Sequence, residues 1–310
     1  MKIASKGLWA DVSLIAVTII WASTFTVIKG SLPLISPGLL IALRFWIAVF
    51  VMALLIPRAW RRIPPHTLRC GGWLAVALSA GFLCQTMGLQ WTTPSRCAFI
   101  TSMYVLLVPL LGWLVLRQPL RGRTLFGVGM AALGLGLLTL RTADFHIGIG
   151  DLLSLAGAAA FAGQILMLGR FLTGNDFRQL AVVQIAGTAL ICSLIVPVIE
   201  RPFWTADFRL VGSLALLGIF ATALAFFMQS SAQRHTSPNR AVLLFSLEPF
   251  FATLIAYWAL GDRLTGREWL GGCLVLAGIL SSEIRRRRCR QESAKSQSKE
   301  SLPGTAVEFE

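Results

Sequence analysis

Two ionisable residues inside apolar segments are the side chains with the clearest capacity for chemistry. Glu248 lies within residues 240–260 and Arg44 within residues 36–56. A charge in apolar surroundings is costly, so such residues are candidates for a functional role. Glu248 could gain and lose a proton, or it could satisfy a cation or backbone groups freed by Pro249. Arg44 could bind Glu248 or a substrate carboxylate, or it could form a fixed structural pair or snorkel to the surface.

Neutral polar and aromatic residues accompany these two charges in other apolar segments. They could contact a small polar ligand in a cavity, although hydrogen bonds between helices, worth about 0.6 kcal/mol each, explain the polar ones equally well. With Arg44 and Glu248, the predicted substrate-cavity residues are Trp21, Thr24, Gln85, Thr101, Tyr104, Gln164, Gln229, Phe245 and Ser246. This composition suits a zwitterion or a modest polar metabolite.

Catalytic and metal-binding patterns are lacking in the sequence. His66, His146 and His235 fall in or near expected loops, and no paired carboxylates or phosphate-binding loop appear. The six cysteines include no Cys-x-x-Cys pair. We therefore expect no catalytic residues, no metal, no cofactor and no enzymatic activity.

The composition excludes most soluble proteins. The chain has 310 residues, of which 55% are hydrophobic and only 14% charged, against about 25% charged in an ordinary soluble domain. Its mean hydropathy is +0.71. Apolar runs of about twenty residues match the roughly 30 Å hydrocarbon core of a bilayer, so we expect a multi-pass protein whose surroundings are lipid.

Apolar runs bounded by charge, Pro or Gly predict ten membrane helices. The loops between them are too short to hold a soluble domain. The predicted spans are residues 9–28, 36–56, 70–90, 95–116, 124–140, 149–171, 179–199, 210–231, 240–260 and 268–284.

The distribution of positive charge predicts the orientation. The net charge is +14, but the cations lie between the spans, so nucleic acid is not an expected partner. Most of the Lys and Arg residues fall in segments that are cytoplasmic if the N-terminus is cytoplasmic. By the positive-inside rule, we therefore expect both termini to be cytoplasmic. We also expect the protein to lie in the inner membrane of the cell. Residues 285–310, which begin with four arginines, predict a disordered basic tail.

An internal repeat relates the two halves of the chain. The shift that places Gln85 on Gln229 also places Pro94 on Pro238 and Arg96 on Arg240, and it makes Tyr104 the counterpart of Glu248. We interpret residues 9–140 and 149–284 as two copies of five spans each. Because five is odd, the copies must have opposite topology, an architecture common in secondary transporters.

Glycines recur at matching positions in the fifth and tenth spans. Small residues let helix backbones approach closely, so we expect these glycines to pack helices together. They are Gly127, Gly134, Gly271 and Gly278.

The sequence resembles the EamA-type carriers of the drug/metabolite transporter superfamily over residues 9–284. The motifs that carry the resemblance are Trp21-Ala22-Ser23-Thr24-Phe25, Glu248-Pro249, Gly261-Asp262-Arg263-Leu264-Thr265 and Gly271-Gly272, with Arg44 on the second span. Asp262 stands where the family usually has Glu, and Ala22 where it usually has Gly. The resemblance implies an all-α membrane protein with ten helices, two inverted five-helix repeats and a central cavity. It also implies export of small metabolites such as amino acids.

Two functions remain open from the sequence, and so does uptake instead of export, since inverted repeats permit both directions. The first is export, by alternating access, of a small polar or amphipathic metabolite that resembles an amino acid. The alternative is a multidrug or cation efflux carrier, with or without proton coupling, which would need Glu248 free rather than neutralised by Arg44. A small-molecule substrate is expected in both cases, and a homodimer stays open.

Overall fold

The computed structural model describes residues 2–115, 117, 119, 122–139, 148–260, 266–267, 269–271, 273–275 and 277–278. The predicted tail at 285–310 and the end of the last predicted span lie outside these residues. The elements are α1 (Lys2–Ser31), α2 (Pro37–Leu55), η1 (Pro57–Trp60), α3 (Pro65–Gly88), α4 (Pro94–Thr101), α5 (Tyr104–Leu114), α6 (Gly122–Thr139), α7 (Ile149–Phe171), α8 (Phe177–Ile199), α9 (Phe208–Gly218), η2 (Ile219–Leu224), α10 (Ala225–Gln233), α11 (Pro238–Phe245) and α12 (Glu248–Leu260).

Local sequence signals account for many of the helix starts. Proline begins α2, α3, α4 and α11, where its fixed φ suits the first turn and its missing N–H costs nothing. Asp176 and Asp207 cap α8 and α9 by accepting backbone hydrogen bonds. No strand occurs in the part of the chain that the structure describes, where Ile35 and Trp204 form an isolated antiparallel bridge.

Seven helical segments are long and apolar enough to cross a membrane. They are Gly7–Ser31, Pro37–Leu55, Pro65–Gly88, Arg96–Leu114, Ile149–Phe171, Phe177–Ile199 and Phe208–Gln233. Their outer surfaces carry large exposed apolar side chains, among them Phe50, Leu194 and Val198. Such a surface suits lipid rather than water, so the chain is a multi-pass membrane protein.

The other three predicted spans differ from these seven. Helix α6 has an apolar segment of only Leu125–Gly134. The span predicted at 240–260 is divided at Ser246 and Leu247 into α11 and α12, as the span predicted at 95–116 is divided at Ser102 and Met103 into α4 and α5, but it is not among the seven segments. Pro249 contributes to this break because it has no N–H to donate to the carbonyl four residues earlier. The span predicted at 268–284 is described only in part.

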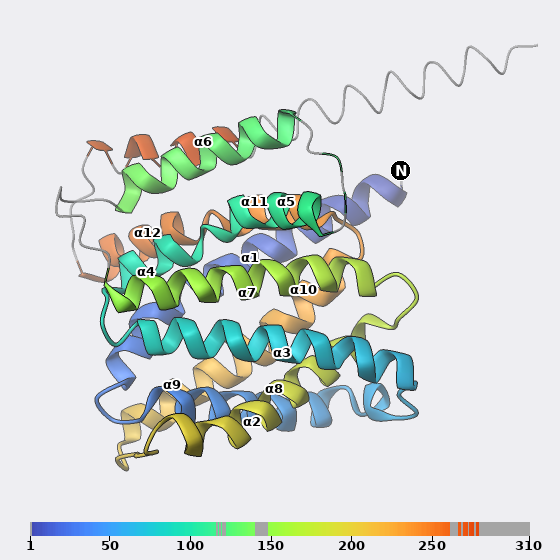
Figure 1. Cartoon of the computed structure of the whole chain (residues 1–310), viewed down its shortest axis with the longest axis vertical. Helices are drawn as coiled ribbons and strands as arrows, with labels where there is room; N and C mark the ends of the chain where they lie inside the picture. The colour runs from blue at the N-terminus through green and yellow to red at the C-terminus, as the bar shows by residue number, and fades with distance from the viewer. Residues whose placement is uncertain are drawn as a thin grey trace, which may run out of the picture.

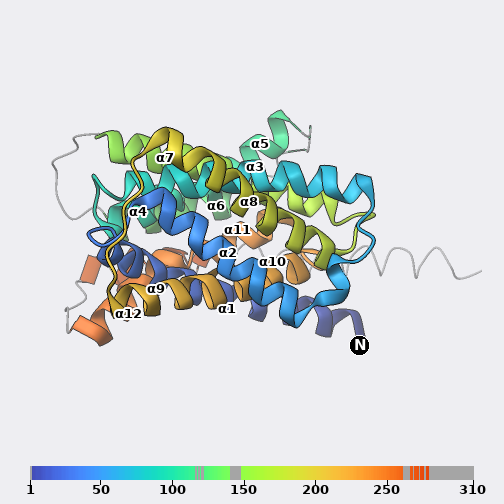
Figure 2. The same cartoon turned by 90° about the horizontal axis from the view of Figure 1, so that it is seen from below.

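The long helices form a bundle in which helices from the two halves alternate. In two perpendicular views they run roughly along one common direction (Figures 1 and 2). Helix α3 packs on α7 and α8, α2 packs on α8, and α1 packs on α10 and α12. The buried clusters therefore join segments that are far apart in the sequence.

The predicted packing glycines lie where α6 meets the segment around residues 271–278. A Cβ atom on Gly134 would lie 2.5 Å from the Gly271 carbonyl oxygen, and one on Gly278 would lie 2.7 Å from the Gly127 carbonyl oxygen. Both obstacles are backbone atoms, which move only if a helix moves. Glycine is therefore required for the close approach of these two segments.

We expect Gly134→Ala to destabilise the protein and Gly129→Ala to leave it stable. The first methyl group would meet backbone, an overpacking effect that costs about 1–3 kcal/mol. The second would enter open space on the same helix and should contribute roughly 0.5–1 kcal/mol through helix propensity. Thermal unfolding in detergent, followed by tryptophan fluorescence, checks the difference. Equal midpoints for the two variants would contradict the close contact.

Candidate functional site

Arg44 is buried near the middle of α2, with 1% of its surface exposed. Its Nε donates a hydrogen bond of 2.9 Å to Thr222 Oγ1, and its Cζ lies 4.7 Å from the centroid of the Phe82 ring. Its Nη1 has no hydrogen-bond partner, and no carboxylate of the described residues forms an ion pair with it. The guanidinium is thus held by one hydroxyl and an aromatic face, and it can still bind an anion.

A π-helical turn positions the groups around Arg44. In η2 the Thr222 hydroxyl donates to the Leu217 carbonyl (2.8 Å) while it accepts from Arg44. The neighbouring Ala221 carbonyl accepts from the Trp21 indole Nε1 at 3.0 Å. Isolated π-turns inside α-helices occur frequently at functional sites, because they redirect backbone and side-chain groups toward the interior.

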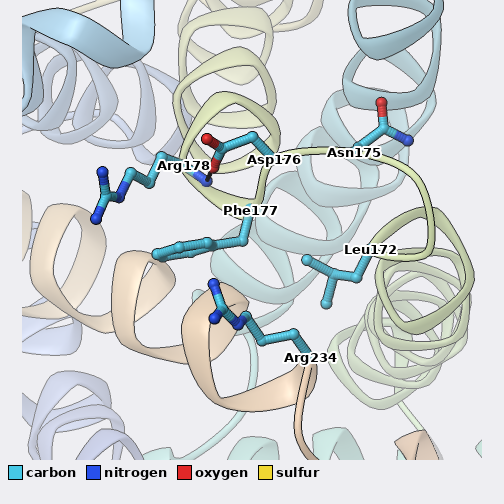
Figure 3. Close-up of a pocket in the computed structure, with 6 residues that line it drawn as sticks. All are labelled: Leu172, Asn175, Asp176, Phe177, Arg178 and Arg234. Atoms are coloured by element: carbon cyan, nitrogen blue, oxygen red, sulfur yellow. Dashed lines mark hydrogen bonds between the residues drawn. The ribbon is translucent and has the colours of Figure 1, made fainter.

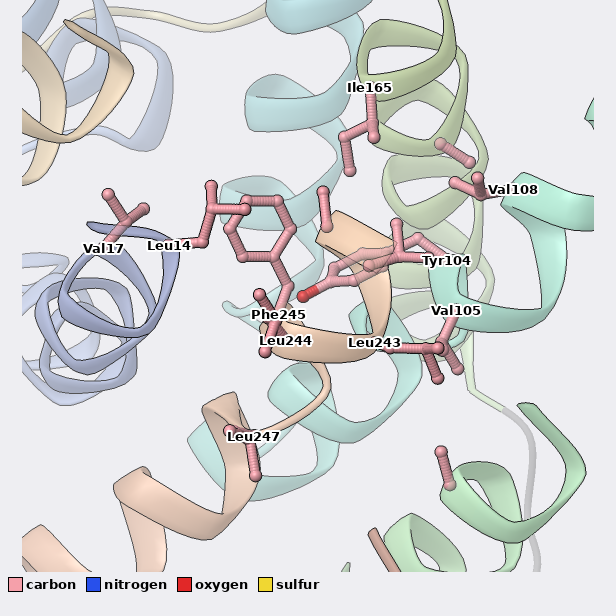
Figure 4. Packing of buried hydrophobic residues seen from close by; sticks show 14 of the residues in the cluster. Leu14, Val17, Tyr104, Val105, Val108, Ile165, Leu243, Leu244, Phe245 and Leu247 are labelled. Carbon is pink, nitrogen blue, oxygen red and sulfur yellow. The ribbon is translucent and has the colours of Figure 1, made fainter. Parts of the chain in front are cut away.

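Aromatic rings line the interior from Arg44 towards Glu248. Trp21 lies between Phe226 and Phe245, with ring centroids 5.4 and 5.2 Å away, and Phe226 lies 6.0 Å from Phe82. Tyr104 contacts Phe245 edge-on, as Figure 4 shows. These rings offer an apolar wall with quadrupolar faces to an amphipathic ligand.

Glu248 is paired with its repeat counterpart and not with Arg44. Its Oε2 accepts a hydrogen bond from the Tyr104 hydroxyl at 3.2 Å, and both side chains are buried. Arg44 and Glu248 form no ion pair with each other. The sequence left two anions open as partners of Arg44, the Glu248 carboxylate and a substrate carboxylate. The Glu248 carboxylate binds Tyr104 instead of Arg44.

Three glutamines and a serine form a chain of side-chain hydrogen bonds. Gln229 donates to Gln164 (3.4 Å), Gln164 donates to Gln184 (3.0 Å), and Gln184 donates to Ser230 (3.3 Å). Gln229 Oε1 has no partner among the described residues. In this hydrogen-bonded network, Gln229 Oε1 is therefore an acceptor that can receive a hydrogen bond from a ligand.

The other predicted cavity residues are engaged locally. Gln85 donates to Thr101 at 3.2 Å. Thr24 donates to the Trp21 carbonyl and Ser246 to the Leu243 carbonyl, each within its own stretch of chain. The hydroxyl protons of these two residues are thus already donated to backbone carbonyls.

Sequence reasoning missed Thr222 and Gln184. Both are polar residues in predicted spans, a signal that was present but not distinctive. Thr222 gains its importance from Arg44, which is 178 positions earlier in the chain, and Gln184 from its contact with Gln164. Only the packing of the helices reveals either role.

A separate open pocket of about 450 Å³ lies where α7 leads into α8 (Figure 3). It contains none of the predicted cavity residues. Its lining residues are Leu172, Asn175, Asp176, Phe177, Arg178 and Arg234. The Arg234 guanidinium lies 4.7 Å from the centroid of the Phe177 ring, at the end of α10.

Comparison with known proteins identifies the family. The model of the EamA-like transporter family matches residues 8–140 and again residues 148–282. The chain belongs to the EamA-like transporter family. Members of this family are transporters and not enzymes.

Relatives of this EamA-family chain are described as transporters. It is 31% identical over 288 residues to an uncharacterized transporter of Archaeoglobus fulgidus, covering 90% of this chain and 87% of the relative. It is 26% identical over 286 residues to a probable amino-acid metabolite efflux pump of Salmonella typhimurium, covering 85% and 91%. A solved crystal structure shares the fold, with a TM-score of 0.73 and 20% identity over 90% of this chain and 98% of that one.

We expect Arg44→Met to raise the thermal stability of this EamA-family protein. Methionine fills a similar volume and removes a buried charge that has no ionic partner among the described residues, a change worth about 1–4 kcal/mol. Thr222 would keep its hydrogen bond to the Leu217 carbonyl. Arg209→Met, at an exposed arginine on α9, serves as control and should change stability by about 0.5 kcal/mol or less. A lower unfolding midpoint for Arg44→Met would show that the guanidinium is structural.

Proposed function

We propose that the chain is a secondary carrier with ten membrane helices in two inverted five-helix repeats, residues 9–140 and 149–284. Two separate matches to one family model, each over about one repeat, support this division. We also propose an inner-membrane location with both termini, including a disordered tail at 285–310, in the cytoplasm. The excess of positive charge in the segments on that side supports this orientation.

Contacts between repeat counterparts support the inverted symmetry. Tyr104 bonds its counterpart Glu248, and Phe82 contacts its counterpart Phe226. The glycine contacts are reciprocal, because Gly134 meets the counterpart of Gly127 while the counterpart of Gly134 meets Gly127. Contacts of this kind are what a pseudo-twofold axis produces.

The substrate class follows from Arg44. A buried guanidinium that forms no ion pair with a carboxylate of the described residues favours a substrate that brings a carboxylate with it. The neighbouring rings favour an apolar portion, so the proposed substrate is a small amphipathic carboxylate that resembles an amino acid. The printed names of the Salmonella typhimurium and Escherichia coli relatives, probable amino-acid metabolite efflux pumps, support the class and the outward direction.

We assign the substrate cavity to the residues predicted from the sequence, with Thr222 added beside Arg44. Alternating access between the two halves would expose this region to one membrane face at a time. Arg44 and Thr222 would orient the carboxylate, and Trp21 and Phe245 would contact the apolar portion. Gln229 would accept a hydrogen bond from a donor of the substrate.

Efflux of lipophilic cations, with or without proton coupling, is the second candidate. It is favoured by one observation: Glu248 is not neutralised by Arg44 and accepts a bond only from the neutral Tyr104 hydroxyl among the described residues. A carboxylate beside Tyr104 and Phe245 resembles the environment that recognises organic cations.

Counterflow in proteoliposomes tests the substrate class. We expect labelled phenylalanine to exchange, and phenylpropionate, which keeps the carboxylate, to compete with it. Phenethylamine, which keeps only the amine, should not compete. Arg44→Lys should weaken apparent affinity by roughly 10- to 100-fold, because lysine lacks the planar fork that binds a carboxylate with two hydrogen bonds. Competition by phenethylamine but not by phenylpropionate would overturn the proposal in favour of cation efflux.

Glu248→Gln separates the two candidate functions. Glutamine keeps an oxygen that accepts the Tyr104 hydrogen bond, but it carries no charge and cannot exchange a proton. We expect amino-acid counterflow to persist in this variant, with and without a pH gradient. If the unmodified protein accumulates cations in response to a pH gradient and the Glu248→Gln variant does not, cation efflux is supported instead.

A further inference from the structure

Two ion pairs join the two halves of the chain. Arg96 of α4 binds Asp151 of α7, with 2.7 Å between Nη2 and Oδ2. Arg240 of α11 binds both carboxylate oxygens of Asp11 on α1. Its Nε donates to Oδ1 at 2.8 Å, and its Nη2 donates to Oδ2. Each pair thus links the fourth helical segment of one half to the first helix of the other half.

The two pairs lie at opposite ends of the bundle. The Lys29 ammonium at the end of α1 bonds the carbonyls of the α3–α4 loop, including that of Thr92. The Thr92 hydroxyl in turn bonds Asp151, so Asp151 lies at the Lys29 end of α1. Asp11 precedes Lys29 by eighteen residues on the same helix, which is about 27 Å at 1.5 Å per residue. That separation is close to the thickness of a bilayer core, roughly 30 Å.

The helices that carry the arginines are built alike. Both α4 and α11 are eight residues long, start with proline and carry the arginine as their third residue. Both end in the same backbone conformation, with φ −65° and ψ −8° at Ser102 and φ −65° and ψ −7° at Ser246. The helix is interrupted at each serine and the residue after it, before α5 and α12 begin. Each arginine therefore lies on a short segment that can tilt about a break in its own span.

The exposure of the pairs suits contacts that open and close. The side chains are 37% and 10% exposed for Arg96 and Asp151, and 24% and 15% for Arg240 and Asp11. Partly hydrated pairs at the membrane faces are far less costly to separate than pairs buried in hydrocarbon, since water replaces the lost contact. A closed contact at each face is also what alternating access requires.

We propose that Arg96–Asp151 and Arg240–Asp11 are the two gates of this carrier, one for each membrane face, and that each face opens by separation of its own pair. The inference rests on alternating access as proposed above. It adds that the arginines of the two gates are repeat counterparts, and that weakening one pair shifts the population toward the conformation open on that side. Both pairs are formed in the structure.

Each gate has a buried neighbour that can report its opening. Cys97 follows Arg96 and has 0% exposure, and Ala241, its repeat counterpart, follows Arg240 and also has 0% exposure. A thiol at either position reacts with a polar maleimide only when the nearby gate is open. Cys97 reports one gate in a background with the other five cysteines replaced, and Ala241→Cys reports the other gate in a background without native cysteines.

The experiment measures labelling by a membrane-impermeant maleimide, applied to spheroplasts and to inverted vesicles. We expect Asp151→Asn to raise the labelling rate of Cys97 about tenfold and not that of the thiol introduced by Ala241→Cys. Asp11→Asn should do the reverse, from the opposite side of the membrane. Asparagine keeps the acceptor oxygen that Asp151 offers to the Gly148 N–H, so the start of α7 is preserved.

Charge exchange provides the control for each gate. The double variant with Asp11→Arg and Arg240→Asp should return labelling to the original rate, as should the double variant with Asp151→Arg and Arg96→Asp. No effect of either single variant, or equal effects at both thiols, would overturn the proposal. Labelling needs no substrate, so it distinguishes failure of the gate assignment from failure of the proposed substrate class.

Discussion

The burial of charge among apolar side chains is the constraint on which this structure depends most. A guanidinium or carboxylate in hydrocarbon costs several kcal/mol unless other groups take the place of water. Arg44 meets this requirement with one hydroxyl and an aromatic ring, and Glu248 with the hydroxyl of Tyr104. In both cases the charged group keeps atoms that can still form hydrogen bonds to a ligand. A buried arginine and carboxylate paired with each other would have fewer such atoms.

The π-helical turn η2 follows from the same constraint. A regular α-helix satisfies its own carbonyl groups, so it has little backbone capacity to offer a neighbour. In η2 the Ala221 carbonyl accepts from Trp21, and the Thr222 hydroxyl bonds both Leu217 and Arg44. One irregular turn thereby holds an aromatic residue of α1 and the cation of α2 in position. The positions of the Trp21 indole and the Arg44 guanidinium thus depend on η2, a mostly apolar segment.

The interlocking of the two halves gives the bundle contacts that are compatible with movement. Glycine backbones of α6 and of the segment around residues 271–278 meet directly, and the ion pairs of Asp11 and Asp151 join helices of the two halves. Small-residue packing holds helices closely without large side chains that must be repacked when they slide. Partly hydrated ion pairs add contacts that water can replace. The centre of the bundle is therefore fixed by packing, while its ends depend on electrostatics.

The family, the membrane location and most helices could be predicted from the sequence, because they depend on local properties. Ten spans were predicted from apolar runs, and seven of them correspond to helices that are long and apolar enough to cross a membrane. The motifs around Trp21 and Glu248 indicate the EamA-like family. The break between α11 and α12 has a visible cause in Pro249. The corresponding break between α4 and α5 lacks a proline at the matching position, and hydropathy alone could not reveal it.

The partners of the buried charges required the tertiary structure. The sequence allowed Arg44 to bind Glu248, a substrate or nothing, since all are compatible with an arginine in an apolar run. Packing of α2 against η2 gave it Thr222, and packing of α5 against α12 gave Glu248 the hydroxyl of Tyr104. Hydropathy and motif depend on neighbours along the chain and so are written in the sequence. Pairing across 144 or 178 positions depends on how helices pack, which no local pattern specifies.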